Sequence, residues 1–185
     1  MRIRALAVAA GLLLCAAVSA RAADPQNTLY LDVPAGRVVI ALRPDLAPRT
    51  VAHIKELVRK GFYNGLTFHR VIAGFMAQTG DPKGDGSGGS GQTVPHEYNN
   101  AHFVRGTVGL ARAQDPDSGD SQFFICFGPA PFLDGKYTAF GEVVSGMEAI
   151  DKIKKGDPDA NGMVENPDRI IRLQIAADAD KRKKS

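Results

Sequence analysis

The stretch FHRVIAGFMAQTGD, Phe68 to Asp81, mixes large apolar side chains with polar ones at internal positions. A strand buried on both faces would exclude Arg70 and Gln78, because burying unpaired polar groups costs free energy. A solvent-exposed segment would not gather so many large apolar side chains, which are Phe68, Val71, Ile72, Phe75 and Met76. The mixture therefore predicts a segment that forms one wall of a pocket.

The rest of the chain repeats short runs of β-branched and aromatic residues, divided by glycine and proline. Together with the two halves of the opening stretch, eight such runs are present. They span 28–33, 36–42, 66–72, 75–79, 106–111, 121–127, 137–144 and 168–176. Short strands separated by turn signals in this way predict a mainly β, closed arrangement.

Two further segments have apolar residues at helical spacing. Residues 48–61 carry a proline near their start and a glycine at their end, as helices commonly do. Residues 145–156 open with Ser145 and Glu148 at the spacing of a capping box. Each segment has a single apolar stripe, which predicts two helices laid against the ends of a barrel.

The N-terminus has the pattern of a secretory signal peptide over residues 1–22. Two arginines precede an uncharged apolar run, and the small-x-small pattern Ala20-Arg21-Ala22 follows it. A membrane anchor needs about 20 apolar residues, and this run is shorter. A lipoprotein site at Cys15 is weakly indicated, because Leu14 is not the small residue expected before it. We expect cleavage after Ala22, export to the periplasm and no stable membrane insertion afterwards.

Removal of the leader changes the charge balance. The whole chain has 23 Lys+Arg against 20 Asp+Glu, and the leader holds three arginines and no acid. The remaining chain is therefore balanced, which gives no case for nucleic-acid binding. Residues 23–178 are expected to form one domain, and residues 179–185 a basic, disordered tail.

Other classes of chemistry find no support in the sequence. The glycine-rich segment 80–91 lacks the order of a phosphate-binding loop and indicates a flexible surface loop. Cys126 lies in the apolar run FFICF, which indicates a buried, inert thiol, and no GxSxG elbow surrounds Ser118 or Ser121. Metal-ligand spacing is absent among the four histidines, His53, His69, His96 and His102. We expect no metal and no cofactor.

Three segments together resemble the cyclophilins, the peptidyl-prolyl cis–trans isomerases. They are the opening stretch, SQFFIC at 121–126 and FLDGKYTAFGEV at 132–143. The likeness covers nearly all of the chain after the leader, in the right order, and the last segment looks more like bacterial members. It implies an eight-stranded antiparallel closed β-barrel capped by two α-helices, with the active site on the outer barrel surface.

The resemblance also assigns residues to that site. It implies that Arg70 is the catalytic residue. It places the substrate-binding residues at Phe75, Met76, Gln78, Ala111, Arg112, Gln122, Phe124, Phe132, Leu133 and Tyr137. It implies proline-containing peptides and folding proteins as partners, and we expect a monomer.

Three positions depart from the common pattern of the family. Phe132 stands where many eukaryotic members have tryptophan, a position tied to binding of cyclosporin-type inhibitors, so reduced drug sensitivity is expected. Tyr137 replaces a histidine, which alters one hydrogen-bonding wall. Arg112 replaces an asparagine, and its backbone N–H can still act while its side chain alters preference for flanking residues.

The residue types suit rotation about an X–Pro bond. Rotation breaks amide conjugation across a barrier of roughly 18–20 kcal/mol, and the proline nitrogen regains a lone pair in the twisted transition state. The fixed guanidinium of Arg70 would stabilise that state more than the planar ground state. Apolar side chains such as Phe75 and Phe124 would seat the proline ring.

Two alternative functions remain open at this point. A proline-peptide binding module with negligible turnover would use the same apolar residues, although a pure binder need not retain Arg70. A role of the basic tail in binding nucleic acid or an anionic membrane is the third hypothesis.

Overall fold

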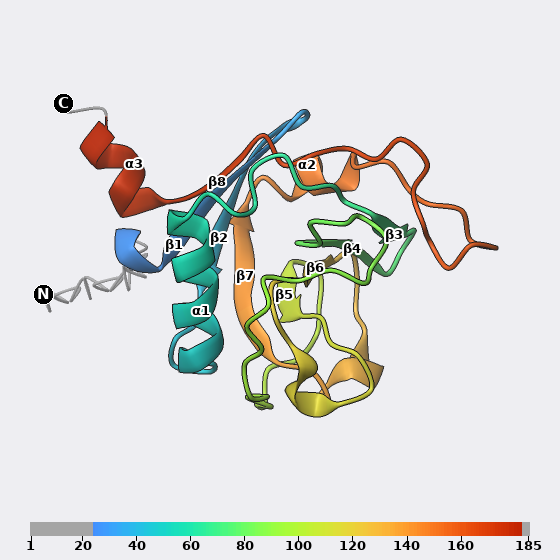
Figure 1. Cartoon of the computed structure of the whole chain (residues 1–185), viewed down its shortest axis with the longest axis horizontal. Coiled ribbons are helices and arrows are strands. Elements are labelled where there is room, and N and C mark those ends of the chain that lie inside the picture. The colour runs from blue at the N-terminus through green and yellow to red at the C-terminus, as the bar shows by residue number, and fades with distance from the viewer. Residues whose placement is uncertain (1–23, 183–185) are drawn as a thin grey trace, which may run out of the picture.

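A computed structural model describes residues 24–182, which form one eight-stranded antiparallel sheet (Figure 1). The strands are β1 (Thr28–Val33), β2 (Gly36–Leu42), β3 (Arg70–Ile72), β4 (Met76–Thr79), β5 (Thr107–Leu110), β6 (Phe123–Cys126), β7 (Ala139–Ser145) and β8 (Arg172–Ile175). Their order across the sheet is β3-β4-β6-β5-β7-β2-β1-β8. The predicted mainly β fold with eight antiparallel strands is confirmed.

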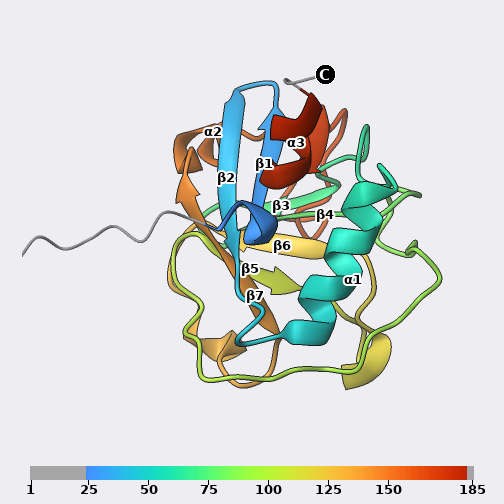
Figure 2. The same cartoon turned by 90° about the vertical axis from the view of Figure 1, so that its left-hand side faces the viewer.

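The sheet curls strongly, as Figure 2 shows, but the expected closed barrel is an overstatement. Within residues 24–182 no ladder joins the edge strands β3 and β8. The chain ahead of β3 meets the chain ahead of β8 through three backbone hydrogen bonds between residues 65–68 and 168–170 and an isolated bridge between Thr67 and Arg169. The free edge of β3 is instead occupied by the segment after α2, through a bridge between Arg70 and Met163. This segment leaves no room for continuous pairing with β8.

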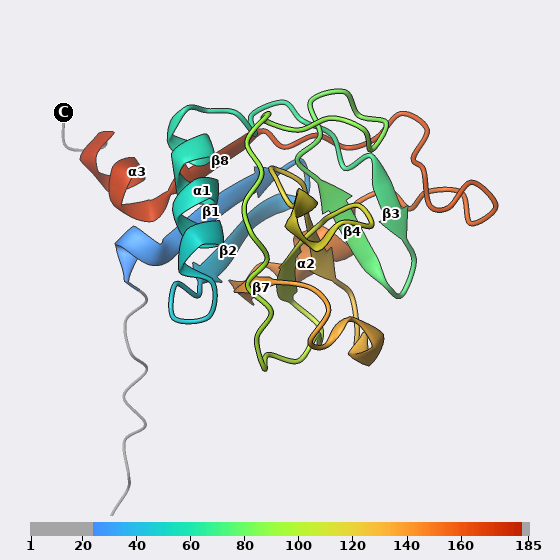
Figure 3. The same ribbon diagram turned by 60° about the horizontal axis from the view of Figure 1, so that its bottom comes forward.

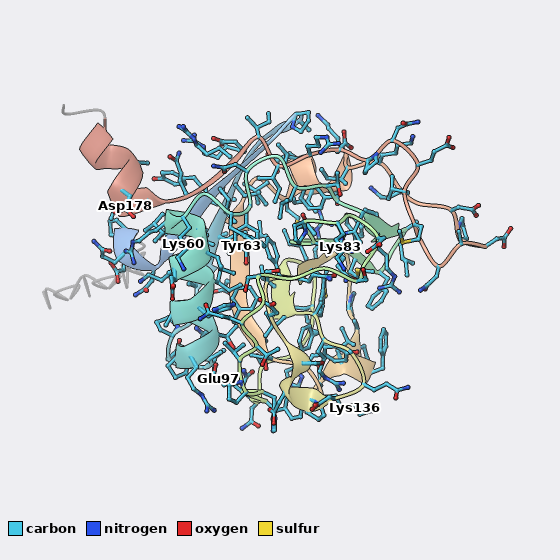
Figure 4. The ribbon with its side chains drawn as sticks, viewed as in Figure 1. Lys60, Tyr63, Lys83, Glu97, Lys136 and Asp178 are labelled. Carbon is cyan, nitrogen blue, oxygen red and sulfur yellow. The ribbon has the colours of Figure 1, made fainter. Side chains whose placement is uncertain are left out.

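The main core lies inside the curl. Alternate residues of β1 and β2 point into it, so that Leu29 pairs with Ile40 and Leu31 with Val38, all buried. Tyr63 is fully buried between α1 and the sheet (Figure 4), and its hydroxyl donates to the Ser121 carbonyl at 3.0 Å. The one polar atom of that aromatic side chain is therefore satisfied within the core.

Helix α1 (Pro48–Arg59) covers one side of the sheet and confirms the helix expected at 48–61. Its N-cap residue Ala47 offers no side-chain acceptor. The carboxylate of Glu97 replaces it, accepting the backbone N–H groups of Arg49 at 3.0 Å and Thr50 at 2.8 Å. Figure 4 shows Glu97 at this end of the helix, opposite Lys60. A side chain distant in sequence thus caps α1, and the negative charge suits the helix N-terminus.

The helix expected at 145–156 is shorter, and the capping box at its start is wrong. Helix α2 spans only Met147–Asp151, and Ser145 is the last residue of β7. Gly146 stands at the N-cap with φ +83°, and a Cβ there would lie 2.2 Å from the Arg37 carbonyl oxygen. The turn passes so close to β2 that its geometry, not a serine cap, starts the helix.

The C-terminal part differs from the prediction as well. The strand expected to reach residue 176 ends at Ile175, and helix α3 (Ala176–Arg182) follows directly. This helix packs against β1 and β8 (Figure 3) and includes residues 179–182 of the expected disordered tail. Residues 183–185 and the expected leader lie outside the described residues.

Three short 3-10 helices complete the fold, η1 (Pro25–Asn27), η2 (Pro116–Ser118) and η3 (Pro131–Leu133). None of the helices described is both long and apolar enough to cross a membrane.

We predict that Glu97→Ala lowers the free energy of unfolding by about 1–2 kcal/mol, because two helix N–H groups lose their acceptor. Denaturant unfolding would measure this loss. Glu148→Ala, which removes an exposed carboxylate without a described hydrogen bond, serves as the control and should change stability little.

The same contact has a defined pH dependence. Burial alone would raise the pKa of Glu97, but the N–H groups of Thr50 and Arg49 outweigh it and hold the pKa below its ordinary 4.5. The contribution is therefore complete above that value and is lost as pH falls through the folded-state pKa. The stability difference between wild type and Glu97→Ala should shrink over that range; a constant difference would contradict this reading.

Candidate active site

A cleft of about 700 Å³ lies on the face of β3, β4 and β6 that points away from the main core. Successive side chains of a strand point to opposite faces of the sheet, so each of these strands contributes both to the main core and to the cleft. Ala77 and Ile125 belong to the main core, whereas Met76 and Phe124 belong to a second apolar cluster beneath the cleft. This alternation explains how the mixed stretch 68–81 fits a strand with one buried and one functional face.

Ten of the eleven predicted site residues line this cleft. They are Arg70, Phe75, Met76, Gln78, Ala111, Arg112, Phe124, Phe132, Leu133 and Tyr137. Gln122 lines an adjoining cavity of about 230 Å³ instead, which it shares with Gln78 and Arg112. The structure therefore brings the predicted set together across two neighbouring hollows.

The floor of the cleft is apolar and tightly packed. Met76, Phe124 and Leu133 are at least 95% buried. The ring of Phe124 stacks on Phe103 with 5.8 Å between centroids. A Cβ on Gly109 would lie only 2.5 Å from Phe124 and 2.7 Å from Phe103, so the stacked pair requires a glycine below it.

The rim is aromatic and open to solvent. Phe132 is 59% exposed, and its ring lies 5.2 Å from that of Phe75, centroid to centroid. An exposed aromatic beside a concave apolar floor is the composition expected of a binding site.

Arg70 lies on edge strand β3 in a row of paired residues that crosses the sheet. Arg70 pairs with Gln78, Gln78 with Phe124, and Phe124 with Gly109. The Arg70 Nη1 donates to Gln78 Oε1 at 3.1 Å. Its Nε and Nη2 donate to the main-chain oxygen and Oδ1 of Asn161, both at 3.0 Å.

The charge of Arg70 has no acidic partner within ion-pair distance among the described residues. Its three hydrogen-bond acceptors are a side-chain amide, a backbone carbonyl and another side-chain amide. Burial lowers the pKa of Arg70, but a guanidinium stays protonated in proteins. The cleft therefore contains a full positive charge held by neutral groups.

Gln78 and Gln122 connect Arg70 to the glycine-rich loop. Gln78 Nε2 donates to Gln122 Oε1 at 2.8 Å, and Gln122 Nε2 donates to the carbonyls of Gly86 and Gly88 at 3.0 and 2.8 Å. Gln122 thus acts on the cleft through Gln78 and does not line it.

The glycine-rich loop is better organised than the flexible surface loop that we expected. The buried carboxylate of Asp81 accepts the backbone N–H groups of Lys83 at 2.8 Å and Gly86 at 2.6 Å. Burial would raise the pKa of Asp81, but these N–H groups hold it below its ordinary value. The loop is folded around one aspartate, and its Gly86 and Ser87 line the cleft.

Arg112 and Tyr137 form the opposite wall. The Arg112 guanidinium lies 4.6 Å from the centroid of the Tyr137 ring and donates to the carbonyls of Ala113 at 2.8 Å and Lys136 at 3.0 Å. Its backbone N–H has no acceptor in the described part of the chain. The side chain therefore stiffens the wall, and the N–H is available to a bound backbone.

Several cleft residues were missed by sequence reasoning. They are His69, Asp85, Gly86, Ser87, Asn161 and Met163. Most lie in loops with no periodic pattern, where the pairs Asp85-Gly86 and Asn161-Gly162 carry turn signals but nothing that points to the cleft. His69 is 99% buried, and neither of its ring nitrogens has a hydrogen-bond partner in the described structure. Burial lowers the pKa of the ring, which is therefore neutral at pH 7.

No group of three or more His, Cys, Asp or Glu residues suited to a metal ion occurs within residues 24–182. Cys126 is fully buried beneath the cleft, and burial raises its pKa to about 12. The sulfur is therefore a packing group, as its apolar surroundings predicted.

Comparison with known proteins relates the chain to one family. Residues 28–175 match the family model described as cyclophilin type peptidyl-prolyl cis-trans isomerase/CLD. A probable peptidyl-prolyl cis-trans isomerase of Brucella suis is 55% identical over 94% of this chain and 96% of its own. A peptidyl-prolyl cis-trans isomerase of Helicobacter pylori is 46% identical over 66% of this chain and 77% of its own.

Solved structures agree. A cyclophilin from Hirschia baltica superposes with a TM-score of 0.75 at 27% identity, covering 84% of this chain and 76% of that one. A cyclophilin type peptidyl-prolyl cis-trans isomerase of Cryptosporidium parvum, crystallised in the presence of the dipeptide Ala-Pro, has a TM-score of 0.73 at 27% identity. It covers 80% of this chain and 98% of its own.

We predict that the Cys126 thiol of a Cys15→Ser protein shows no measurable reaction with a disulfide reagent at pH 8 until the protein is unfolded in denaturant. Both burial and the raised pKa suppress the thiolate. A colorimetric thiol assay with and without denaturant tests this, and rapid labelling of the native protein would show that the floor of the cleft opens readily.

Proposed function

The chain belongs to the cyclophilin-type peptidyl-prolyl cis–trans isomerases and has their activity, and we propose that Arg70 is the residue that catalyses the rotation. The reaction interconverts the cis and trans forms of an X–Pro bond, which takes tens to hundreds of seconds without a catalyst. No covalent intermediate is needed. The protein has only to stabilise the twisted amide.

The observation that supports this role is the unpaired charge of Arg70 above an apolar floor. In the twisted amide the proline nitrogen becomes pyramidal and basic, so an N–H donor on a cation stabilises it. The planar ground state offers that nitrogen no lone pair and gains little from the same contact. Fixed donors aimed at developing electron density are an effective form of catalysis in a partly dry site.

The remaining cleft residues hold the substrate in this proposal. The pyrrolidine ring sits on Met76, Phe124 and Leu133, which bury apolar surface without polar atoms. The free backbone N–H of Arg112 anchors a carbonyl of the residue before the proline. The aromatic rim at Phe132 lies where flanking residues of the peptide would pass.

We also propose that the enzyme assists the folding of exported proteins. The support is the leader-like sequence of residues 1–22, whose basic start, apolar run and small-x-small end match a cleavable signal peptide. Proline-containing segments of newly exported chains are the corresponding substrates.

We predict that Arg70→Ala lowers kcat/KM for an Ala-Pro peptide by about 100- to 1,000-fold while changing peptide binding far less, because the lost contact forms only in the transition state. Exchange measured by NMR at known peptide concentrations separates the two effects. Arg172→Ala on the exposed edge of β8 is the matched control and should keep full activity.

A folded Arg70→Ala protein with the wild-type exchange rate would remove Arg70 from the reaction. A parallel loss of peptide binding and rate would make it a binding residue instead.

We predict that the full chain, expressed in a Gram-negative host, is recovered from the periplasm with Ala23 as its first residue. Deletion of residues 2–22 should leave the protein in the cytoplasm. Fractionation and mass spectrometry of the intact protein measure both outcomes. Full-length protein in the cytoplasm would refute the export proposal without affecting the isomerase activity.

A further inference from the structure

The segment between α2 and β8 runs out beyond β3, on the right of Figure 1, and returns along its edge. Residues 156–164 of this segment, here called the strap, bond directly to β3. The Val71 N–H donates to the Gly162 carbonyl at 2.7 Å, and the Val71 carbonyl accepts the Gly156 N–H at 2.9 Å. The Val164 N–H donates to the His69 carbonyl at 3.0 Å. The strap is therefore fixed to the residues on both sides of Arg70.

The tip of the strap places Asn161 against the Arg70 guanidinium. Asn161 has φ +54°, a left-handed conformation that asparagine tolerates better than most residues. In this conformation both its main-chain oxygen and its Oδ1 point at Arg70, accepting from Nε and Nη2 at 3.0 Å each. The turn is closed by the Gly162 N–H, which donates to the Asp157 carbonyl at 2.7 Å.

These bonds decide which donors of Arg70 remain. A guanidinium has five N–H groups, and Asn161 and Gln78 accept three of them. One N–H on each terminal nitrogen is left for a substrate. Asn161 on the strap and Gln78 on β4 hold the guanidinium from opposite sides, so its plane and direction are fixed before a peptide binds.

Neutral acceptors have a second consequence. A carboxylate in the place of either amide would hold the arginine equally well, but it would compensate the positive charge. Both side chains that hold Arg70 are amides. The two amides thus orient the Arg70 guanidinium as carboxylates would, but they leave its positive charge uncompensated.

We propose that Asn161 is a positioning residue for the isomerase reaction, presenting neutral acceptors that aim the Arg70 guanidinium at the rotating amide. The inference rests on the proposed catalytic role of Arg70. It assigns a kinetic function to the strap, whose Asn161 and Met163 line the cleft.

Three variants test the proposal. Asn161→Gly keeps the left-handed turn and the main-chain acceptor but removes Oδ1. Asn161→Asp keeps an acceptor at the same place and adds a negative charge. Asn166→Gly is the matched control, because Asn166 has φ +52° in the same segment and its side chain makes no described hydrogen bond. Each variant is measured for kcat and KM with an Ala-Pro peptide.

We expect Asn161→Gly and Asn161→Asp each to lower kcat about tenfold with little change in KM, and Asn166→Gly to match wild type. In an Arg70→Lys background, which lacks the planar fork, Asn161→Gly should have no further effect. The NMR signals of Arg70 Nη1 and Nη2 should be separate in wild type and merge in Asn161→Gly, as the guanidinium gains freedom to rotate.

Three results would overturn the proposal. They are wild-type kcat in Asn161→Gly, an equal loss in Asn166→Gly, or the same fold-loss in the wild-type and Arg70→Lys backgrounds. Wild-type kcat in Asn161→Asp would refute the requirement for a neutral acceptor. An Arg70→Ala protein that remains fully active would instead refute the catalytic role of Arg70, so the two failures are distinguishable.

Discussion

Strands β4 and β6 contribute side chains to the main core from one face and to the floor of the cleft from the other. The site depends on this alternation. Phe123 and Ile125 fill the main core, whereas Phe124 and Cys126 support the cleft from the other face. A register slip of one residue would exchange the two sets and remove the core and the binding floor together. The same register places Gln78 opposite both Arg70 and Phe124. Stability and chemistry are therefore fixed by one ladder of hydrogen bonds.

Electrostatics in the cleft follow from what surrounds that ladder. Asp85, which lines the cleft, accepts the Ser87 N–H at 2.8 Å, and Asp81 accepts the N–H groups of Lys83 and Gly86. Arg70 is left with amides and carbonyls. A half-buried cation without a counterion costs folding free energy. In the catalytic role that we propose for Arg70, the same uncompensated charge stabilises the electron-rich transition state.

Much of this arrangement could be predicted from the sequence, and the reasons are specific. Short runs of β-branched and aromatic residues divided by turn residues predicted eight strands, and the likeness of three segments to one family located ten residues of one cleft. The errors concern contacts between distant segments. Ser145 fits a capping box locally, but the approach of β2 to Gly146 sets the turn. The N-terminus of α1 is capped by Glu97, far along the chain.

Asn161 escaped prediction for the same reason, because nothing in its neighbourhood of the sequence indicates an arginine 91 residues away. The closed barrel was overstated because short β runs do not reveal which edges meet. Helix α3 was taken for strand and tail because its few apolar residues pack on β1 and β8 rather than forming a long stripe. Local sequence pattern thus identifies the strands, whereas contacts between segments far apart in the sequence are seen only in the three-dimensional structure.

The strap covers the outer edge of β3, and this matters in a protein that binds extended polypeptides. An exposed strand edge is a template on which another chain can add a strand and start aggregation. The strap takes the donor and the acceptor of Val71 at that edge. A client chain that enters the cleft is thereby offered side chains and isolated N–H groups, but little free β-edge beside them. The enzyme can then release what it binds, because the client does not become part of its sheet.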